Sequence, residues 1–214
     1  MKSIKMLVDS TKRTINEILA ANEAYRTECE KAEAYNAVTK NDKLDQAEQN
    51  RLTQLYHLKD VFLDAKKASR SLTEEYLSGK FTMALSPEDE ATLSNLSKIT
   101  LSESEMRLHY ENYRNHPLAL RRLQTIAKEN DVAIHSSALA EVISGNLQDY
   151  DYYESIYSDY VRTCEIAITE IENMNPTRFS EFDQIAVDVQ TATVDNAAES
   201  TEIEFSKLGG VVNV

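Results

Sequence analysis

Apolar residues recur at alternating steps of four and three residues along most of the first 78 positions. This spacing places side chains on one face of an α-helix. One stripe runs through residues 4–35 and a second through residues 44–76, and neither Gly nor Pro interrupts them. Each helix would have one apolar face and a charged remainder. The pattern therefore predicts a long antiparallel hairpin over residues 3–78, in which each stripe covers the other.

Polar residues and a glycine indicate where these two helices end. The polar stretch 39–43 is the expected turn, with Asn41 or Asp42 capping the second helix through a side-chain oxygen. Gly79 suits the left-handed position that ends many helices. On the first stripe, Asn22 occupies a position where one buried Asn can fix register and partner number in a coiled coil, although a solvated or exposed Asn is the more common case at such a position. Asn22 is therefore a candidate interface residue.

Shorter helices are expected over residues 86–145. Ser86 followed by Pro87 is a strong helix start, because Ser caps the helix and Pro lacks only an N–H that the first turn does not use. The sequence Ser102-x-x-Glu105 is a capping box that opens a second helix. Pro117 breaks that helix, and a helical stripe then resumes to about residue 130. One more short helix, over residues 137–144, is expected to stop at Gly145.

A long helix is predicted over residues 149–174, where the helical spacing resumes. Five of the eleven tyrosines lie between positions 150 and 160. Tyr153, Tyr157 and Tyr160 fall on the apolar stripe and are expected in the core, with their hydroxyl groups reaching its rim. Tyr150 and Tyr152 lie off that stripe and are interface candidates, because tyrosine combines a large apolar ring with a polar tip.

The last segment, residues 175–214, has a different character. From position 179 to 206 it holds seven acidic residues and neither Lys nor Arg. Its apolar residues alternate with polar ones, which favours extended or β conformation. The alternating residues, which are interface candidates, are Ile185, Val187, Val189, Ile203 and Phe205. We therefore expect a helical body over residues 1–174 and an acidic C-terminal arm over residues 175–214, extended or partly β, that lies on a neighbouring subunit or on its own body.

Composition narrows the classes of partner. The formal net charge is −13, which disfavours nucleic acid and anionic membrane surfaces, since both attract proteins through clustered Lys and Arg. No apolar run approaches the roughly 20 residues of a membrane-spanning helix. The N-terminal residues turn polar before the apolar region of a signal peptide can form, so a cytoplasmic location during synthesis is expected.

Sequence motifs for catalysis or cofactor binding are missing. Four glycines at positions 79, 145, 209 and 210 cannot form a phosphate-binding glycine-rich loop. No histidine has the spacing of a di-iron or zinc motif. We therefore expect no catalytic residue, no cofactor and no metal site. The alternative is a composite site of Glu105, His109 and His116, which share one helix face.

These features together predict an all-α fold: a long helical hairpin with further helices in an elongated, coiled-coil-like bundle. They favour a structural or assembly protein, which binds copies of itself and other structural proteins. In helix length, capping style and C-terminal arm the chain resembles small helical structural proteins of tailed bacteriophages, such as head-assembly, inner-core or connector components. That resemblance implies many copies in a virion and no enzyme activity. The alternatives are a cytosolic helical adaptor or chaperone-like protein and, least favoured, an α-helical enzyme.

Overall fold

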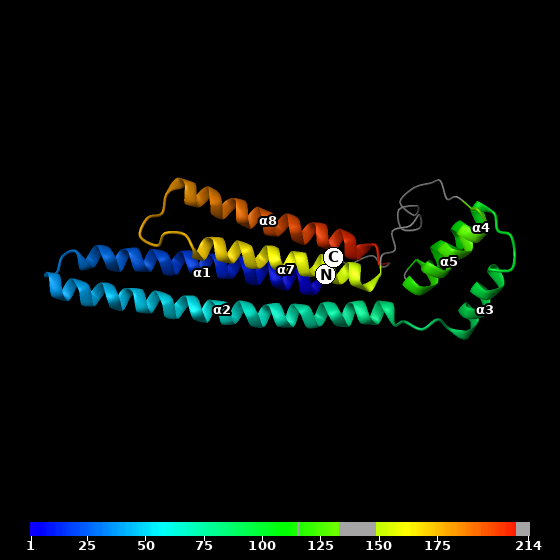
Figure 1. The fold of residues 1–214 in the computed structure, drawn as a ribbon, viewed down its shortest axis with the longest axis horizontal. Coiled ribbons are helices and arrows are strands. Elements are labelled where there is room, and N and C mark those ends of the chain that lie inside the picture. The colour runs from blue at the N-terminus through cyan, green and yellow to red at the C-terminus, as the bar shows by residue number, and fades with distance from the viewer. Residues whose placement is uncertain (115, 133–148, 209–214) are drawn as a thin grey trace. The chain divides into compact units, whose positions relative to one another are not determined.

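The computed structural model describes residues 1–114, 116–132 and 149–208, and all regular structure in them is α-helix. The all-α class is therefore confirmed. The helix expected over residues 137–144, its stop at Gly145, and the last residues of the C-terminal arm, 209–214, lie outside the described residues. The helices are α1 (Lys2–Ala32), α2 (Ala37–Phe81), α3 (Pro87–Leu96), α4 (Glu103–Tyr113), α5 (Pro117–Glu129), α7 (Tyr150–Glu172) and α8 (Glu181–Ser206), as labelled in Figure 1.

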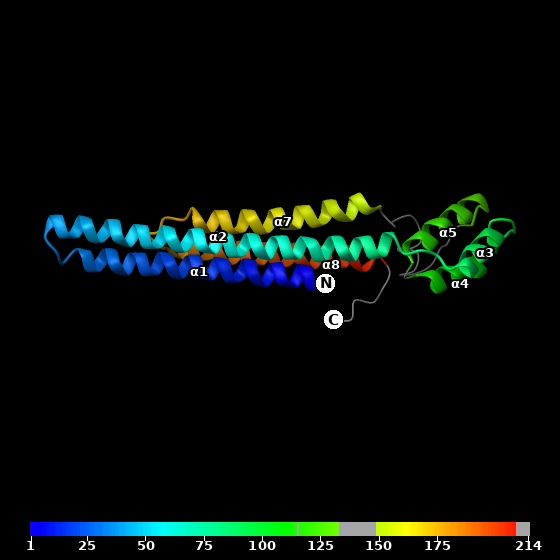
Figure 2. The same cartoon turned by 90° about the horizontal axis from the view of Figure 1, so that it is seen from below.

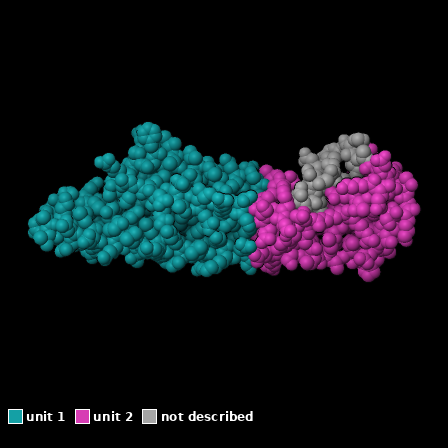
Figure 3. All heavy atoms as spheres, viewed as in Figure 1, with its two compact units in different colours: residues 1–72, 157–201 teal, residues 73–156, 202–214 magenta. Residues whose placement is uncertain are grey.

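The chain forms two compact units, which are coloured separately in Figure 3. Unit 1 consists of residues 1–72 and 157–201, and unit 2 of residues 73–156 and 202–214. Unit 1 therefore contains α1 and most of α2, α7 and α8. Unit 2 contains α3, α4, α5 and the remaining ends of those long helices.

In unit 1, α1 and α2 lie side by side and run in opposite directions (Figure 2). Near the start of α1, the carbonyl of Ser3 accepts a hydrogen bond of 2.8 Å from the hydroxyl of Ser69, which lies late in α2. Further along α1, Asn22 accepts a bond of 2.7 Å from Arg51. These contacts fit the antiparallel pairing expected from the two apolar stripes.

Helices α7 and α8 complete unit 1, and each runs antiparallel to a neighbour. Lys59 and Lys66 of α2 form ion pairs with Glu172 and Glu165 of α7, respectively. On the other side, α8 pairs with α1 through Lys12 and Asp195, whose atoms Nζ and Oδ1 are 2.6 Å apart. Because all four helices bury apolar side chains between them, unit 1 is a four-helix bundle. Its core includes Ile4, Leu7, Ile15, Ile18, Leu55, Phe62, Cys164, Ala167, Ile171 and Val194.

Tyr153, Tyr157 and Tyr160 of α7 are buried as predicted, but the expectation that their hydroxyl groups reach the rim of the core is wrong, because those hydroxyls are buried as well. Tyr157 and Tyr160 are buried, and Tyr160 donates a hydrogen bond of 3.0 Å to the carbonyl of Ile4. The hydroxyl groups of Tyr157 and Ser69 are 2.6 Å apart. These hydroxyls therefore connect α7 to α1 and α2 inside the bundle, because a buried polar group must find a partner to offset its lost hydration.

The turn between α1 and α2 lies earlier than predicted. Helix α1 ends at Ala32 and α2 begins at Ala37, so the expected turn at 39–43 is wrong. Asn36, rather than Asn41 or Asp42, caps α2, because its Oδ1 accepts the backbone N–H of Thr39 at 3.1 Å. Residues 39–43 are polar because they lie in an exposed or half-exposed part of the helix, where polarity does not signal a break.

Gly79 lies inside α2, which continues to Phe81, so the expectation that it ends the helix is wrong. The glycine does not have a left-handed backbone, and a Cβ built at this position meets nothing within 4 Å. A single glycine lowers helix stability by about 1 kcal/mol relative to alanine, which a long packed helix tolerates. The position of Gly79 is therefore not the end of the helix.

The greatest departure from expectation is α8, which replaces the extended arm predicted for this segment. Ser180 and Asp183 cap the helix reciprocally: the Ser180 N–H donates to the Asp183 carboxylate at 2.7 Å, and the Asp183 N–H donates to the Ser180 hydroxyl at 3.3 Å. One face of α8 is buried, with its members at helical spacing: Val187, Val194, Ala198, Thr201, Phe205. The apparent alternation over residues 185–189 arises because Ile185 and Val189 lie one turn apart on the opposite face.

Unit 2 has a separate apolar core, contributed by α3, α4 and α5. The helix starts predicted for α3 and α4 are confirmed, since Ser86 caps α3 ahead of Pro87 and the Ser102–Glu105 capping box opens α4. The Ser102 hydroxyl and N–H hold the pKa of the Glu105 carboxyl below its ordinary value. The buried core residues are Leu93, Leu96, Leu101, Met106, Tyr110, Ala119, Leu120, Leu123, Ile126 and Ala127.

Candidate interaction surface

The outward face of α8 in unit 1 carries three large apolar side chains that are exposed. Phe182, Ile185 and Val189 lie at steps of three and four residues, and their exposed fractions are 83%, 57% and 55%. The buried stripe of α8 lies on the other side of the helix, so these three side chains are not part of the core. We call Phe182, Ile185 and Val189 the outer stripe of α8.

Acidic residues border the outer stripe. At 100° per residue, Glu181 and Asp188 fall along one edge of the stripe, and Glu199 continues the same edge ten residues beyond Val189; all three are exposed. No Lys or Arg lies between positions 179 and 206. The stripe is therefore an apolar surface bordered by negative charge, which suits a basic, amphipathic partner.

Of the eight residues predicted at an interface, two lie on the outer stripe, Ile185 and Val189. Ile203 is exposed on α8 within unit 2. Val187 and Phe205 are only 6% and 1% exposed, so their assignment to an interface with a partner is wrong for this structure. They face the core because α8 is a helix, in which residues two apart point in different directions.

Asn22 does not face a partner chain, since it is 3% exposed inside unit 1. Its Oδ1 accepts a hydrogen bond of 2.7 Å from Nε of Arg51, which is itself 8% exposed. The Arg51 guanidinium lies 5.7 Å from the ring centre of Tyr25, and it forms an ion pair of 3.2 Å with Glu48. Asn22 therefore joins α1 to α2 within one chain.

Tyr150 and Tyr152 are half-buried and make contacts within unit 2. The ring of Tyr150 meets the ring of Phe81 edge to face at 5.8 Å. The Tyr152 hydroxyl donates a hydrogen bond of 3.2 Å to Glu204. Both side chains already pack against described residues, so they offer less free surface than the outer stripe of α8.

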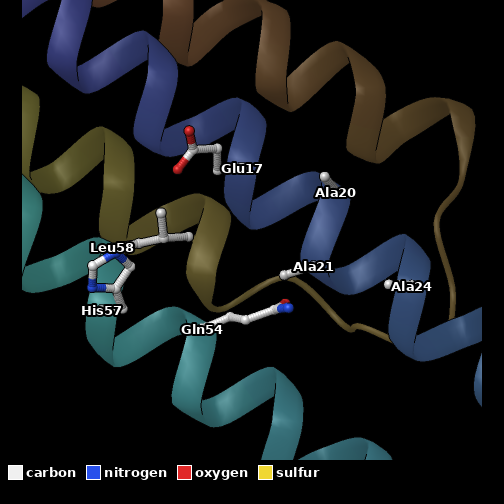
Figure 4. A pocket seen from close by; sticks show the side chains of 7 residues that line it. All are labelled: Glu17, Ala20, Ala21, Ala24, Gln54, His57 and Leu58. Carbon is white, nitrogen blue, oxygen red and sulfur yellow. The ribbon is translucent and has the colours of Figure 1, made fainter.

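Two pockets lie between α1 and α2 in unit 1, and we call them together the α1–α2 groove. Its central part has a volume of about 340 Å³ and is lined by small side chains of α1, Ala20, Ala21 and Ala24, facing Gln54, His57 and Leu58 of α2 (Figure 4). Glu17 lies at one end of this part. Small residues allow another helix to approach closely, so this part of the groove suits a helical partner.

The other pocket of the groove lies nearer the start of α1, and its lining is basic. This second part has a volume of about 480 Å³, and Met6, Val61 and Ala65 supply apolar surface. Lys2, Lys5 and Arg13 line it together with the acid Asp9. All four charged side chains are exposed. The groove therefore combines an apolar surface with positive charge in a chain that is otherwise strongly acidic.

Two residues of the possible composite catalytic site, Glu105 and His116, have structural roles. Glu105 belongs to the capping box of α4. The Nδ1 atom of His116 accepts the Ala119 N–H at 3.4 Å, which caps α5. Among the described residues, no group of three His, Cys, Asp or Glu side chains has the arrangement of a metal site. Cys29 and Cys164 are both free thiols, and only Cys164 is fully buried.

None of the described helices combines the length and apolar character that crossing a bilayer requires. Models of protein families, curated proteins and solved structures give no significant match to this chain.

Sequence reasoning identified Ile185 and Val189 but missed Phe182 and the α1–α2 groove. The signal for Phe182 was present, since positions 182, 185 and 189 follow the steps of three and four that mark a helix face. The alternation of Ile185, Val187 and Val189 obscured it. The groove had no signal in the sequence, because it depends on how α1 packs against α2.

Proposed function

We propose that this chain is a non-enzymatic structural or assembly protein that binds other proteins through the outer stripe of α8. The observation that carries the proposal is the exposure of Phe182, Ile185 and Val189 on a helix whose other face is buried in unit 1. Three large apolar side chains on one exposed face favour association, since covering them removes apolar area from water at about 25 cal/mol per Å².

The apolar seams of unit 1 are occupied within the chain itself. The apolar stripes of α1 and α2 supply the core of the bundle. The helices therefore provide a rigid support, and the surface of α8 provides the contact with a partner. We propose that such a contact forms in a virion that contains many copies of the chain, as in the tailed-phage proteins that the sequence resembles.

The native complex tests this function. The double variant Ile185→Asp with Val189→Asp places two charges on the outer stripe, and Ile166→Asp is a matched control on α7, where Ile166 is 47% exposed. In extract from the native source, wild type and control should sediment together as a complex larger than the monomer. The double variant should sediment as a monomer. A double variant that stays in the large complex would contradict the proposed function.

A cytosolic adaptor is the second candidate, favoured by the one-sided acidic border of the outer stripe. An adaptor would bind one basic partner through the same stripe and give a small complex of fixed size. Light scattering on the native complex distinguishes the two candidates, because an assembly component gives a large or symmetric particle.

A further inference from the structure

Unit 1 carries two exposed surfaces of opposite charge, the outer stripe of α8 and the basic part of the α1–α2 groove. We propose that the outer stripe of one copy docks into the α1–α2 groove of a second copy, so that the chain associates head to tail. This inference rests on the proposed function and names the partner of the outer stripe as the chain itself.

The groove offers the stripe a suitable surface. Its apolar lining includes Met6, Val61 and Ala65 in the basic part, and alanines of α1 in the central part. The side chains of Phe182, Ile185 and Val189 form a ridge along one face of α8. A ridge of side chains on one helix that packs into a groove on its neighbour is the common geometry of helix packing.

The charges of the two surfaces are opposite in sign, and charged residues recur at the same interval along the two helices. Lys2 and Arg13 are eleven residues apart on α1, and Asp188 and Glu199 are eleven residues apart on α8. Each interval spans about 17 Å along a helix axis. In the basic part of the groove, the three cations Lys2, Lys5 and Arg13 outnumber the one acid, Asp9. Within the described residues, none of the three forms an ion pair in its own chain.

Charge also excludes the symmetric alternative, in which the outer stripes of two copies meet. That contact would place the acidic borders of two α8 helices together with no Lys or Arg between positions 179 and 206 to balance them. Two different surfaces of one chain that fit each other give a heterologous contact. Such contacts produce rings where the rotation between copies closes and filaments where it does not.

Charge reversal on purified full-length protein tests the inference. One variant, Lys5→Glu with Arg13→Glu, reverses the charge of the groove. The other, Asp188→Lys with Glu199→Lys, reverses the charge beside the outer stripe. All four side chains are exposed, so the helical circular dichroism and melting temperature should stay those of wild type. Lys43→Glu with Arg162→Glu is the control for the groove variant, because it makes the same change in net charge at exposed positions outside the groove.

Sedimentation should show oligomers for wild type and control that dissociate as salt concentration rises. Each reversed variant alone should be a monomer, because like charges then face each other. An equimolar mixture of the two variants should regain oligomers, since the acidic stripe of one fits the basic groove of the other. Should a reversed variant fail to fold, the neutral pairs Lys5→Gln with Arg13→Gln and Asp188→Asn with Glu199→Gln are expected to weaken association at least tenfold.

Two outcomes overturn the inference: wild type that is monomeric at every concentration, and a mixture of reversed variants that remains monomeric. Neither outcome affects the proposed function if the native complex still depends on Ile185 and Val189. In that case the outer stripe binds a different protein. If the native complex does not depend on those residues, the proposed function fails first.

Discussion

Arg51 of α2 donates its Nε–H to the Oδ1 of Asn22 of α1 over 2.7 Å, and both side chains are buried. A buried guanidinium loses its hydration and needs partners in fixed positions. Asn22, Glu48 and the ring of Tyr25 supply them. Because a hydrogen bond of this kind forms in one register only, the pair fixes how far α1 slides along α2.

The first prediction concerns this pair. Arg51→Met leaves the Asn22 oxygen without its donor, and Asn22→Leu leaves the guanidinium without its acceptor. Each single variant should lower the free energy of unfolding by about 1–3 kcal/mol. The loss of unfolding free energy in the double variant should be smaller than the sum of the two single losses by about 1 kcal/mol or more, because neither group is then left unsatisfied. Chemical denaturation measures the free energy of unfolding of wild type, the two single variants and the double variant. Strictly additive losses would contradict the coupling.

Gly79→Ala should stabilise the protein. The residue lies within α2, its backbone is not left-handed, and an added Cβ meets no atom within 4 Å. Alanine favours a helix by about 1 kcal/mol over glycine, so the melting temperature should rise by a few degrees. A lower melting temperature would indicate instead that Gly79 ends the helix in a left-handed conformation.

Alkaline pH should weaken unit 2. Burial raises the pKa of Tyr110 to about 12. Loss of hydration, followed by the hydrogen bond to Asp89, raises the pKa of Tyr113 to about 12 as well. Folded pKa values above the ordinary value of about 10 mean that the folded state favours the neutral phenols. Their contribution to stability is therefore complete below about pH 10 and is lost as pH rises from there through about 12.

Thermal melts between about pH 9 and about pH 12 measure this effect, with absorbance reporting the tyrosinates. The variant Tyr110→Phe with Tyr113→Phe removes both titrating groups and should lose less stability over that range than wild type does. An equal loss in both proteins would mean that other groups cause the alkaline unfolding.

The sequence predicted most helices, because helix formation is signalled locally. Ser86 with Pro87, and Ser102 with Glu105, marked two helix starts that the structure confirms. The Ser180 and Asp183 pair carries the same type of signal before α8, whereas the alternation of Ile185, Val187 and Val189 favours an extended segment. The structure resolves the two readings: Val187 packs into unit 1, whereas Ile185 and Val189 point outward.

The candidate surface was harder to predict than the fold. An exposed apolar residue differs from a core residue only in what packs against it, and that depends on contacts between distant parts of the chain. Asn22 shows the difficulty, since its position on the stripe fits a subunit interface and a pairing inside one chain equally well. Arg51, 29 residues away, decides between them. The α1–α2 groove likewise exists only after the two helices pack.

The last prediction separates the two faces of α8. Val194 is 0% exposed and Val189 is 55% exposed, and both are valines on one helix. Val194→Asp buries a carboxylate without a positive partner, so it should lower the free energy of unfolding by about 3 kcal/mol or more and shift the thermal melt well below that of wild type. Val189→Asp places the same carboxylate in water, so the free energy of unfolding should change by no more than about 0.5 kcal/mol while association weakens.

Truncation after Met174 removes both faces and should destabilise unit 1, because α1 then loses the buried contacts of α8. A truncated protein that kept the wild-type melting temperature would show that α8 is a separate arm; equal melts for the two valine variants would show that its two faces are not distinct.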